Sequence, residues 1–148
     1  MLEFEPTKNR SMWTYATCCM SAEGDDSPVE LYMFSATQDR GLVELLTAAA
    51  SYHRNNAKLD LSHTVNFGQP WQKDSPCTYG FISLPYLDGP DLEHAVISGY
   101  EREVQFYWLI PVTEAEVDFK KSCGVEALEI KFEESGFDYL NPNRASVV

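Results

Sequence analysis

The residues best equipped for chemistry stand in the segment 61–71, LSHTVNFGQPW, and in the loops after it. His63 could act as a general base or as a metal ligand. Carboxylates that could complete a catalytic set with it are Asp74, Asp88 and Asp91. A loop histidine whose ring hydrogen-bonds a neighbouring backbone group is more common than a catalytic one. We therefore expect His63 to order this loop, and an enzyme built on these residues is our third hypothesis.

The sequence lacks the recognised motifs for metal, phosphate and nucleophilic chemistry. Its three histidines, His53, His63 and His94, are not spaced one helical turn apart, and it has no nucleophile elbow, Walker motif or dinucleotide fingerprint. The cysteines include the adjacent pair Cys18 and Cys19 but no Cys-x-x-Cys, so we expect reduced, mostly buried thiols. The sequence thus predicts no metal and no cofactor, whereas a nucleophile, a base and an orienting group brought together only by folding stay open on spacing alone.

The charge of the chain is strongly acidic. Asp and Glu total 23 against 11 for Lys and Arg, a net charge of -12 at pH 7. Such a field repels nucleic-acid phosphates and anionic lipids and attracts a basic protein, although solubility alone is the simpler explanation. The N-terminus has no basic start before an apolar run, and no stretch approaches the roughly 20 apolar residues that span a bilayer. We expect a cytoplasmic protein that contacts neither nucleic acid nor membrane directly.

Hydrophobic periodicity predicts two strands and a helix in the first part of the chain. Residues 11–21 are rich in aromatic, Thr and Cys residues, and 29–35 alternate like a strand with one apolar face, so the two should form a hairpin. Residues 41–53 place apolar side chains at helical spacing, with Thr37 or Asp39 as the N-cap. The asparagine pair that follows can end this helix in a left-handed conformation, before an irregular loop.

The second part of the chain predicts strands at 78–86 and 102–113 and helices at 114–122 and 125–134. The strand at 102–113 carries the most continuous apolar run, which indicates a central strand covered on both faces. Thr113 and Glu116 have the spacing of a capping box at a helix start. Gly124 separates the two helices.

These elements predict one α+β domain spanning residues 1–148, because this length is near the commonest size for a single domain. Its mixed or mostly antiparallel sheet should be packed by helices. Flexibility, if any, should be confined to residues 1–10 and 145–148.

The sequence resembles the suppressor of fused family in its small bacterial form. The resemblance rests on LSHTVNFGQPW, then CTYGFISLPYLDGPDLE, then VQFYWLIPVTEAEVDFKKSCGVEALEIKFEE and finally YLNPNRASVV. It covers the chain from Leu42 to the C-terminus. Its most specific parts are residues 110–116 with Gly124, and residues 144–146.

The resemblance implies an α/β domain without enzymatic activity. Larger, two-part animal members hold zinc-finger transcription factors of the Hedgehog pathway by gripping a short peptide as an added strand. This chain has the length of one such domain, so the clamp between two domains does not carry over. Bacterial relatives are implied to act as immunity proteins that neutralise a toxin domain.

The leading hypothesis is therefore a non-enzymatic protein-binding module, an immunity-type protein whose partner is a basic toxin or nuclease domain. The alternative is an adaptor or regulatory protein that binds a peptide at a sheet edge. The chain should be a monomer or a homodimer. The region richest in acidic groups beside an aromatic residue is the predicted partner surface: Trp71, Asp74, Asp88, Asp91 and Glu93. Trp71 could equally cover the edge of the core.

Overall fold

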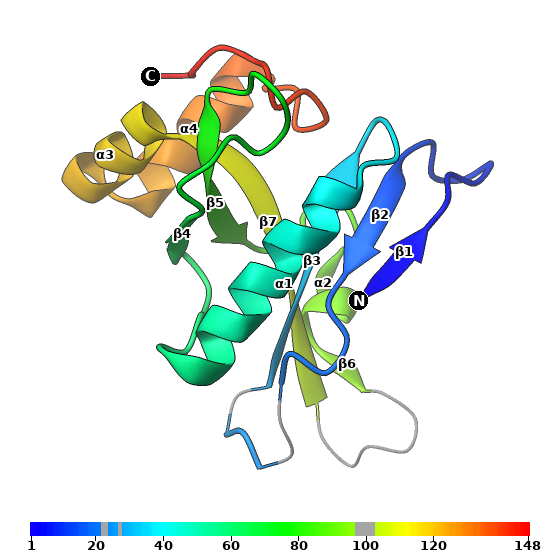
Figure 1. Ribbon diagram of the computed structural model, residues 1–148. Coiled ribbons are helices and arrows are strands. Elements are labelled where there is room, and N and C mark those ends of the chain that lie inside the picture. Colours follow the sequence, from blue (N-terminus) through cyan, green and yellow to red (C-terminus); the bar gives the residue numbers. More distant parts are fainter. Residues whose placement is uncertain (22–23, 27, 97–102) are drawn as a thin grey trace.

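One long central strand, β7 (Glu103–Thr113), organises a mixed sheet in the computed structural model, which describes residues 1–21, 24–26, 28–96 and 103–148 (Figure 1). On one side β7 pairs in parallel with β3 (Val29–Ser35), and on the other it pairs antiparallel with β5 (Cys77–Ser83). The strand order is β1-β2-β3-β7-β5-β4, with β6 also paired to β7. The predicted core strand and the α+β fold class are confirmed.

The remaining strands are short and lie toward the edges of the sheet. They are β1 (Leu2–Phe4), β2 (Trp13–Ala16), β4 (Thr64–Asn66) and β6 (Ala95–Val96). The predicted hairpin is confirmed because β2 pairs antiparallel with β3, although β2 is much shorter than the stretch 11–21. Sequence analysis did not predict β1 or β6. Its irregular loop after the first helix contains β4, which is too short to show a period of two.

Helices cover the two faces of the sheet unequally. They are α1 (Arg40–Asn55), the short α2 (Pro90–Glu93), α3 (Glu114–Cys123) and α4 (Val125–Ser135). Apolar residues of α1 pack with Leu31 and Leu109 on one face. Apolar residues of α3 and α4 pack with Phe81, Trp108 and Ile110 on the other. Because neighbouring strand residues point to opposite faces, α1 and the α3–α4 pair lie on opposite sides of the sheet.

Local signals explain where the long helices begin and end. Asp39 caps α1, its carboxylate accepting a hydrogen bond from the Gly41 N–H at 2.8 Å. The predicted capping box at Thr113 is confirmed, since its side chain accepts from the N–H of Glu116 while the Glu116 carboxylate accepts from the N–H of Thr113. The prediction that α1 ends in a left-handed residue is wrong, because its C-cap Asn56 has φ -120°.

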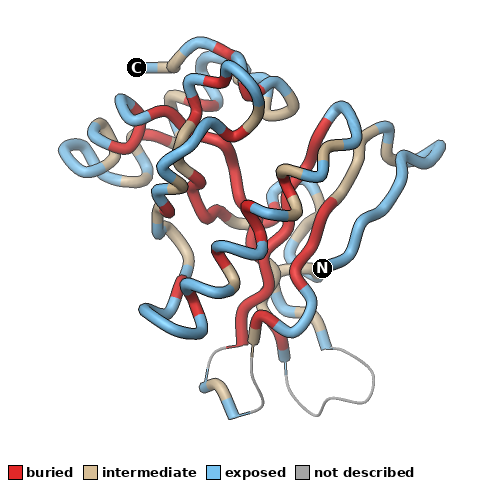
Figure 2. Tube along the Cα trace, viewed as in Figure 1, coloured by how far each residue is buried: buried red, intermediate tan, exposed pale blue. Residues whose placement is uncertain are grey.

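The burial of β3 differs from the sequence prediction of one apolar face. All seven of its residues are buried, as are most residues of β7 (Figure 2). β3 lies between β2 and β7, and side chains on both of its faces are covered. The alternation along β3 therefore does not separate a solvent-exposed face from a buried one. It places Glu30, Tyr32 and Phe34 in one buried environment and the more apolar residues in another.

The C-terminal tail is fastened to the sheet by a buried ion pair. The Arg144 guanidinium donates to both carboxylate oxygens of Glu116, at 2.6 and 3.0 Å, and to the Pro111 carbonyl at 3.0 Å. Its Cζ also lies 5.2 Å from the centre of the Phe137 ring. These contacts of Arg144 join the tail to α3 and to the end of β7.

Candidate functional site

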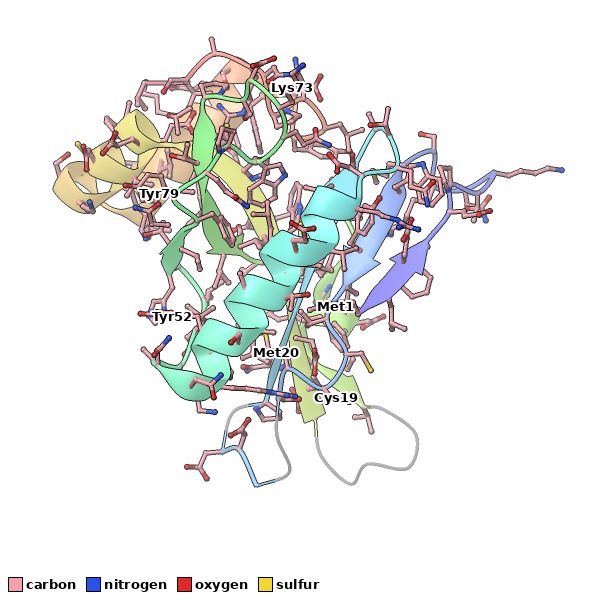
Figure 3. All side chains as sticks on the ribbon, viewed as in Figure 1. Met1, Cys19, Met20, Tyr52, Lys73 and Tyr79 are labelled. Atoms are coloured by element: carbon pink, nitrogen blue, oxygen red, sulfur yellow. The ribbon has the colours of Figure 1, made fainter. Side chains whose placement is uncertain are left out.

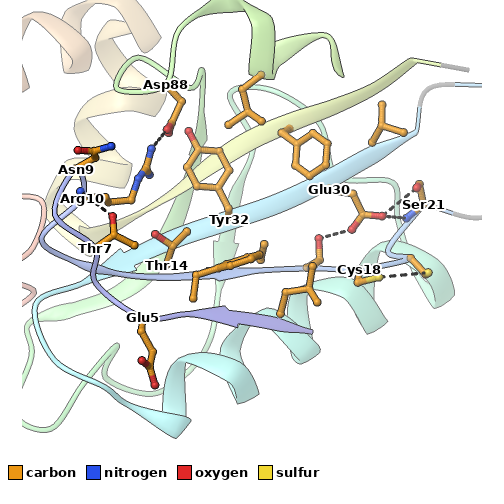
Figure 4. A pocket seen from close by; sticks show the side chains of 18 of the residues that line it. Glu5, Thr7, Asn9, Arg10, Thr14, Cys18, Ser21, Glu30, Tyr32 and Asp88 are labelled. Carbon is orange, nitrogen blue, oxygen red and sulfur yellow. Dashed lines mark hydrogen bonds and ion pairs between the residues drawn. The ribbon is translucent and has the colours of Figure 1, made fainter. Parts of the chain in front are cut away.

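An open groove of about 1070 Å³ lies on the sheet face that carries α3 and α4, over β1, β2, β3 and the start of β7 (Figure 4). Register places Leu2 opposite Ala16 and Phe4 opposite Thr14, so β1 and β2 present these side chains to the same face. The exposed lining of the groove is mainly apolar, although many polar residues also contribute to it. The aliphatic and phenylalanine side chains in the lining are Leu2, Phe4, Ala16, Leu92, Val104 and Phe106. Leu2 and Phe4 are about half exposed, at 46% and 51%.

One end of the groove is built around an ion pair between Arg10 and Asp88 (Figure 4). Arg10 comes from the loop after β1, and its Cζ lies 5.1 Å from the centre of the Phe34 ring. Asp88 comes from the turn before α2. The pair thus connects two segments that are distant in sequence across the sheet face.

Three polar side-chain atoms in this part of the groove are buried and have no hydrogen-bond partner among the described residues: Thr14 Oγ1, Tyr32 Oη and Asp88 Oδ2. Burial, followed by the nearby charge of Asp88, raises the pKa of Tyr32 far above its usual range. Its phenol is therefore a hydrogen-bond donor at all physiological pH values. The Tyr32 hydroxyl lies beside the Asp88 carboxylate, and this contact also contributes to the raised pKa of Tyr32, although the two groups do not meet in good hydrogen-bond geometry (Figure 4).

The other end of the groove contains a buried carboxylate held by uncharged donors. Glu30 is 4% exposed and accepts hydrogen bonds from the Thr17 hydroxyl, the Met20 N–H at 3.2 Å, and the N–H and hydroxyl of Ser21 at 3.3 and 3.0 Å. These donors fix the turn that follows β2. The Glu30 carboxylate is thus already hydrogen-bonded by groups of its own chain.

The adjacent cysteines line the same end of the groove. Cys18 and Cys19 are exposed, their sulfur atoms lie 3.6 Å apart, and Cys19 has φ 63°. The hydrogen bond with Cys19 raises the pKa of the Cys18 thiol, so Cys18 is not an activated nucleophile. Cys123 is also exposed and only Cys77 is buried, so the prediction of mostly buried thiols is wrong.

Three of the five predicted partner residues gather beside the groove. Asp88 lines it, while Asp91 and Glu93 belong to α2, which contributes Leu92 to the groove wall. Asp91 is exposed and Glu93 is partly exposed, 3.5 Å from His94. The structure therefore places an acidic rim, defined here as Asp88, Asp91 and Glu93, next to an apolar surface.

Trp71 and Asp74 lie elsewhere. Trp71 is 4% exposed, belongs to the core under α1 and makes an edge contact with Phe67, with ring centres 5.8 Å apart. This placement fits a tryptophan that covers the core edge. Asp74 is exposed, with φ 63°. Lys73, in the same loop, lies at the opposite end of the molecule from Cys19 of the groove (Figure 3).

His63 does not form a catalytic set with the predicted carboxylates. Its ring Nδ1 accepts a hydrogen bond from the Asp60 N–H at 3.1 Å, which orders the turn before β4. Among the described residues, no hydrogen bond or ion pair joins it to Asp74, Asp88 or Asp91. It lines neither the groove nor a smaller hollow of about 340 Å³ between α4 and the sheet.

Sequence analysis missed the polar residues of the groove itself. Arg10 stands in a segment with no periodic pattern, and its pairing with Asp88 depends on the sheet order. Thr14 and Tyr32 stand on strands that the sequence predicted. Their polar side chains within otherwise apolar strands were the only sign in the sequence that they line a site. No described helix is long and apolar enough to cross a membrane, and the described residues contain no group of three metal-ligating side chains.

Comparison with known proteins gives a consistent result. The family model for suppressor of fused protein matches residues 1–145. A suppressor of fused homologue from Neisseria gonorrhoeae FA 1090 is 34% identical, with a TM-score of 0.82 over 99% of this chain and 76% of that one. No curated protein matches the chain.

Two more distant structures share the fold. The Sufu-Fu complex contains a chain that is 13% identical, with a TM-score of 0.71 over 99% of this chain and 75% of that one. Drosophila Suppressor of Fused is 13% identical, with a TM-score of 0.70 over 99% of this chain and 42% of that one. At this identity the similarity concerns the fold alone.

Proposed function

The chain belongs to the suppressor of fused family, and we propose that it is a non-enzymatic module that binds a protein partner over the groove. The observation that carries this proposal is a large apolar groove open to solvent beside an acidic rim. Exposed apolar surface rimmed by polar groups is typical of protein interaction sites. A structure with the same fold has also been determined as the Sufu-Fu complex.

The partner in this proposal is a basic toxin or nuclease domain, and the chain acts as its immunity protein in the cytoplasm. The net charge of -12 supports this identity, because complementary charge speeds the encounter of two proteins and disfavours wrong partners. The acidic rim supplies part of that charge where the partner would dock. Asp91 and Glu93 would meet cationic side chains of the toxin.

A peptide adaptor is the second candidate, and β1 is the observation that favours it. β1 ends the strand order and pairs only with β2 among the described strands, so its outer edge can accept a further strand. Its three residues are all exposed. Peptide binding at β1 would depend on backbone hydrogen bonds and little on the acidic rim.

Coexpression with the product of the adjacent gene tests the leading proposal. Growth protection and copurification of that product with the tagged chain are expected, and both should weaken in the variant Asp91→Lys/Glu93→Lys. A folded chain that neither protects nor copurifies would contradict the immunity role. Binding that survives this variant but is lost when Glu3 is replaced by proline would favour the adaptor, because proline in β1 distorts the edge strand.

A further inference from the structure

We propose that the groove recognises an uncharged side-chain amide, from an Asn or Gln of a partner segment, through Tyr32, Thr14 and Asp88. This inference deepens the proposed function and rests on it, because it names the partner group that the groove would take. The starting observation is that the Tyr32 hydroxyl and Asp88 Oδ2, two buried polar atoms without a hydrogen-bond partner among the described residues, lie side by side at one end of the groove, with the buried Thr14 hydroxyl farther along the same wall (Figure 4).

Unpaired buried polar atoms are rare in folded proteins, because each loses its hydrogen bonds to water without replacement. Tyr32 is 3% exposed and the Asp88 side chain is 11% exposed. Neither the Tyr32 hydroxyl nor Asp88 Oδ2 has a hydrogen-bond partner in the described part of the chain. A ligand that pairs with these atoms would remove this cost, and the removal would contribute to its affinity.

The local charge indicates that the ligand group is neutral. Arg10 and Asp88 compensate each other at this end of the groove. An added carboxylate would lie beside Asp88, and an added ammonium would lie beside Arg10. Either would leave one charge unbalanced next to buried groups whose own charges already cancel.

The hydrogen-bonding chemistry of the three atoms further restricts which ligand group can bind here. Tyr32 is a donor, Asp88 Oδ2 is an acceptor and the Thr14 hydroxyl can act as either. The ligand group must therefore accept from Tyr32 and donate to Asp88. A primary amide has a carbonyl acceptor and an NH₂ donor side by side, which fits this requirement.

The open shape and the lining of the groove, more than its volume, indicate that the amide is part of a peptide. Small-molecule pockets hold about 300–1,000 Å³ and enclose most of their ligand. This groove has about 1070 Å³ and opens along the sheet. Its apolar side chains, among them Leu2, Phe4 and Phe106, would contact apolar residues next to the amide.

The variants Tyr32→Phe and Thr14→Val separate this role from a structural one. Each removes an unpaired polar atom, so the free protein should melt at the same or a higher temperature. Binding of the partner should weaken about fivefold to tenfold in each. Tyr139→Phe is the matched control, because Tyr139 lies outside the groove and its change should leave binding intact. Lower stability with unchanged binding would overturn the proposal.

A direct test uses three probes that share one apolar body: hydrocinnamamide, hydrocinnamate and phenylpropylamine. Each is titrated to about 10 mM into the labelled protein while amide NMR shifts are recorded. The neutral amide should bind most tightly, with shifts at Thr14, Tyr32 and Asp88, and Tyr32→Phe should weaken it. Tighter binding of the carboxylate or the amine, or no binding of the amide, would overturn the proposal.

Selection from a displayed library of random peptides tests whether the occupant is a peptide. Peptides enriched on the protein should carry Asn or Gln flanked by apolar residues, and Tyr32→Phe should not retain them. Binding of hydrocinnamamide without any peptide enrichment would assign the groove to a small molecule and contradict the peptide. These probes need no toxin, so failure of the amide site is distinguishable from failure of the immunity role.

Discussion

The ion pair between Glu116 and Arg144 illustrates a single contact with a large effect. Glu116 is fully buried and the Arg144 side chain is 6% exposed. Burial opposes ionisation of Glu116, but Arg144 and the N–H groups of Thr113 and Val147 outweigh it, so the pKa of Glu116 lies below its usual range. The stability from this pairing is complete above about pH 4.5, the ordinary pKa, and is lost as pH falls through the lower folded-state pKa.

Removing Arg144 should therefore destabilise the protein strongly. We expect Arg144→Met to lower the free energy of unfolding by about 3–5 kcal/mol, because it leaves the Glu116 carboxylate buried without its cation. Urea denaturation at pH 7 measures the loss. In the double variant Glu116→Gln/Arg144→Met the total loss should be smaller than the sum of the single losses. Strict additivity would mean that the two residues do not stabilise each other.

His53 predicts a second pH effect, at milder acidity. It is 2% exposed, and its Nδ1 accepts a hydrogen bond from the Leu59 N–H at 2.9 Å. Burial, and then the charge of Lys58, lowers the pKa of His53 from its ordinary 6.5. Below that value the unfolded state takes up a proton that the folded state resists, so stability falls as pH decreases.

Melting temperatures recorded between pH 7.5 and 5 measure this loss. The variant His53→Asn keeps an acceptor near the Leu59 N–H but cannot take up a proton in this range. Its melting temperature should vary less with pH over the same interval. An identical decline in both proteins would assign the pH dependence to other groups.

At the scale of elements, Gly80 shows how β5 and β7 approach one another. A Cβ atom at Gly80 would lie 2.7 Å from Leu109 Cδ1 and 3.0 Å from Phe67 Cε2. Leu109 is fully buried, so it has little space to move. We expect Gly80→Ala to cost about 1–3 kcal/mol in thermal or chemical denaturation. Thr78→Ala on the same strand is the control, and an equal effect of both would contradict a steric cause.

The elements with a strong local signal are those that the sequence predicted. The apolar run of β7, the helical spacing of α1 and the capping box at Thr113 depend on residues close together in the chain. β1, β4 and β6 have two or three residues each, too few to show a period. Their strand conformation depends on pairing with partners that only the folded sheet supplies.

The candidate site, like the fold, was predictable from the sequence only in part. The acidic residues around α2 were predicted from composition, and they do lie beside a groove. The pairing of Asp88 with Arg10 was not predictable, since Arg10 reaches it from a segment far away in sequence. Trp71 was ambiguous because a tryptophan serves as well in a core as at an interface.

For the whole molecule, the central claim is that a protein partner docks over the groove and its acidic rim. The net charge of -12 alone would attract any basic protein from every direction. A docked partner, in contrast, should respond to where the charge is placed. Two variants with the same change in net charge can therefore separate general attraction from specific binding.

The most direct measurement is the dissociation constant of the partner for Asp91→Lys/Glu93→Lys compared with Asp118→Lys/Glu134→Lys. Both pairs invert two carboxylates on helices, and Asp118 and Glu134 are exposed on α3 and α4, away from the groove. We predict that binding weakens at least about tenfold in the first variant and much less in the second. Equal weakening in both, or a larger loss in the second, would contradict the groove as the partner site.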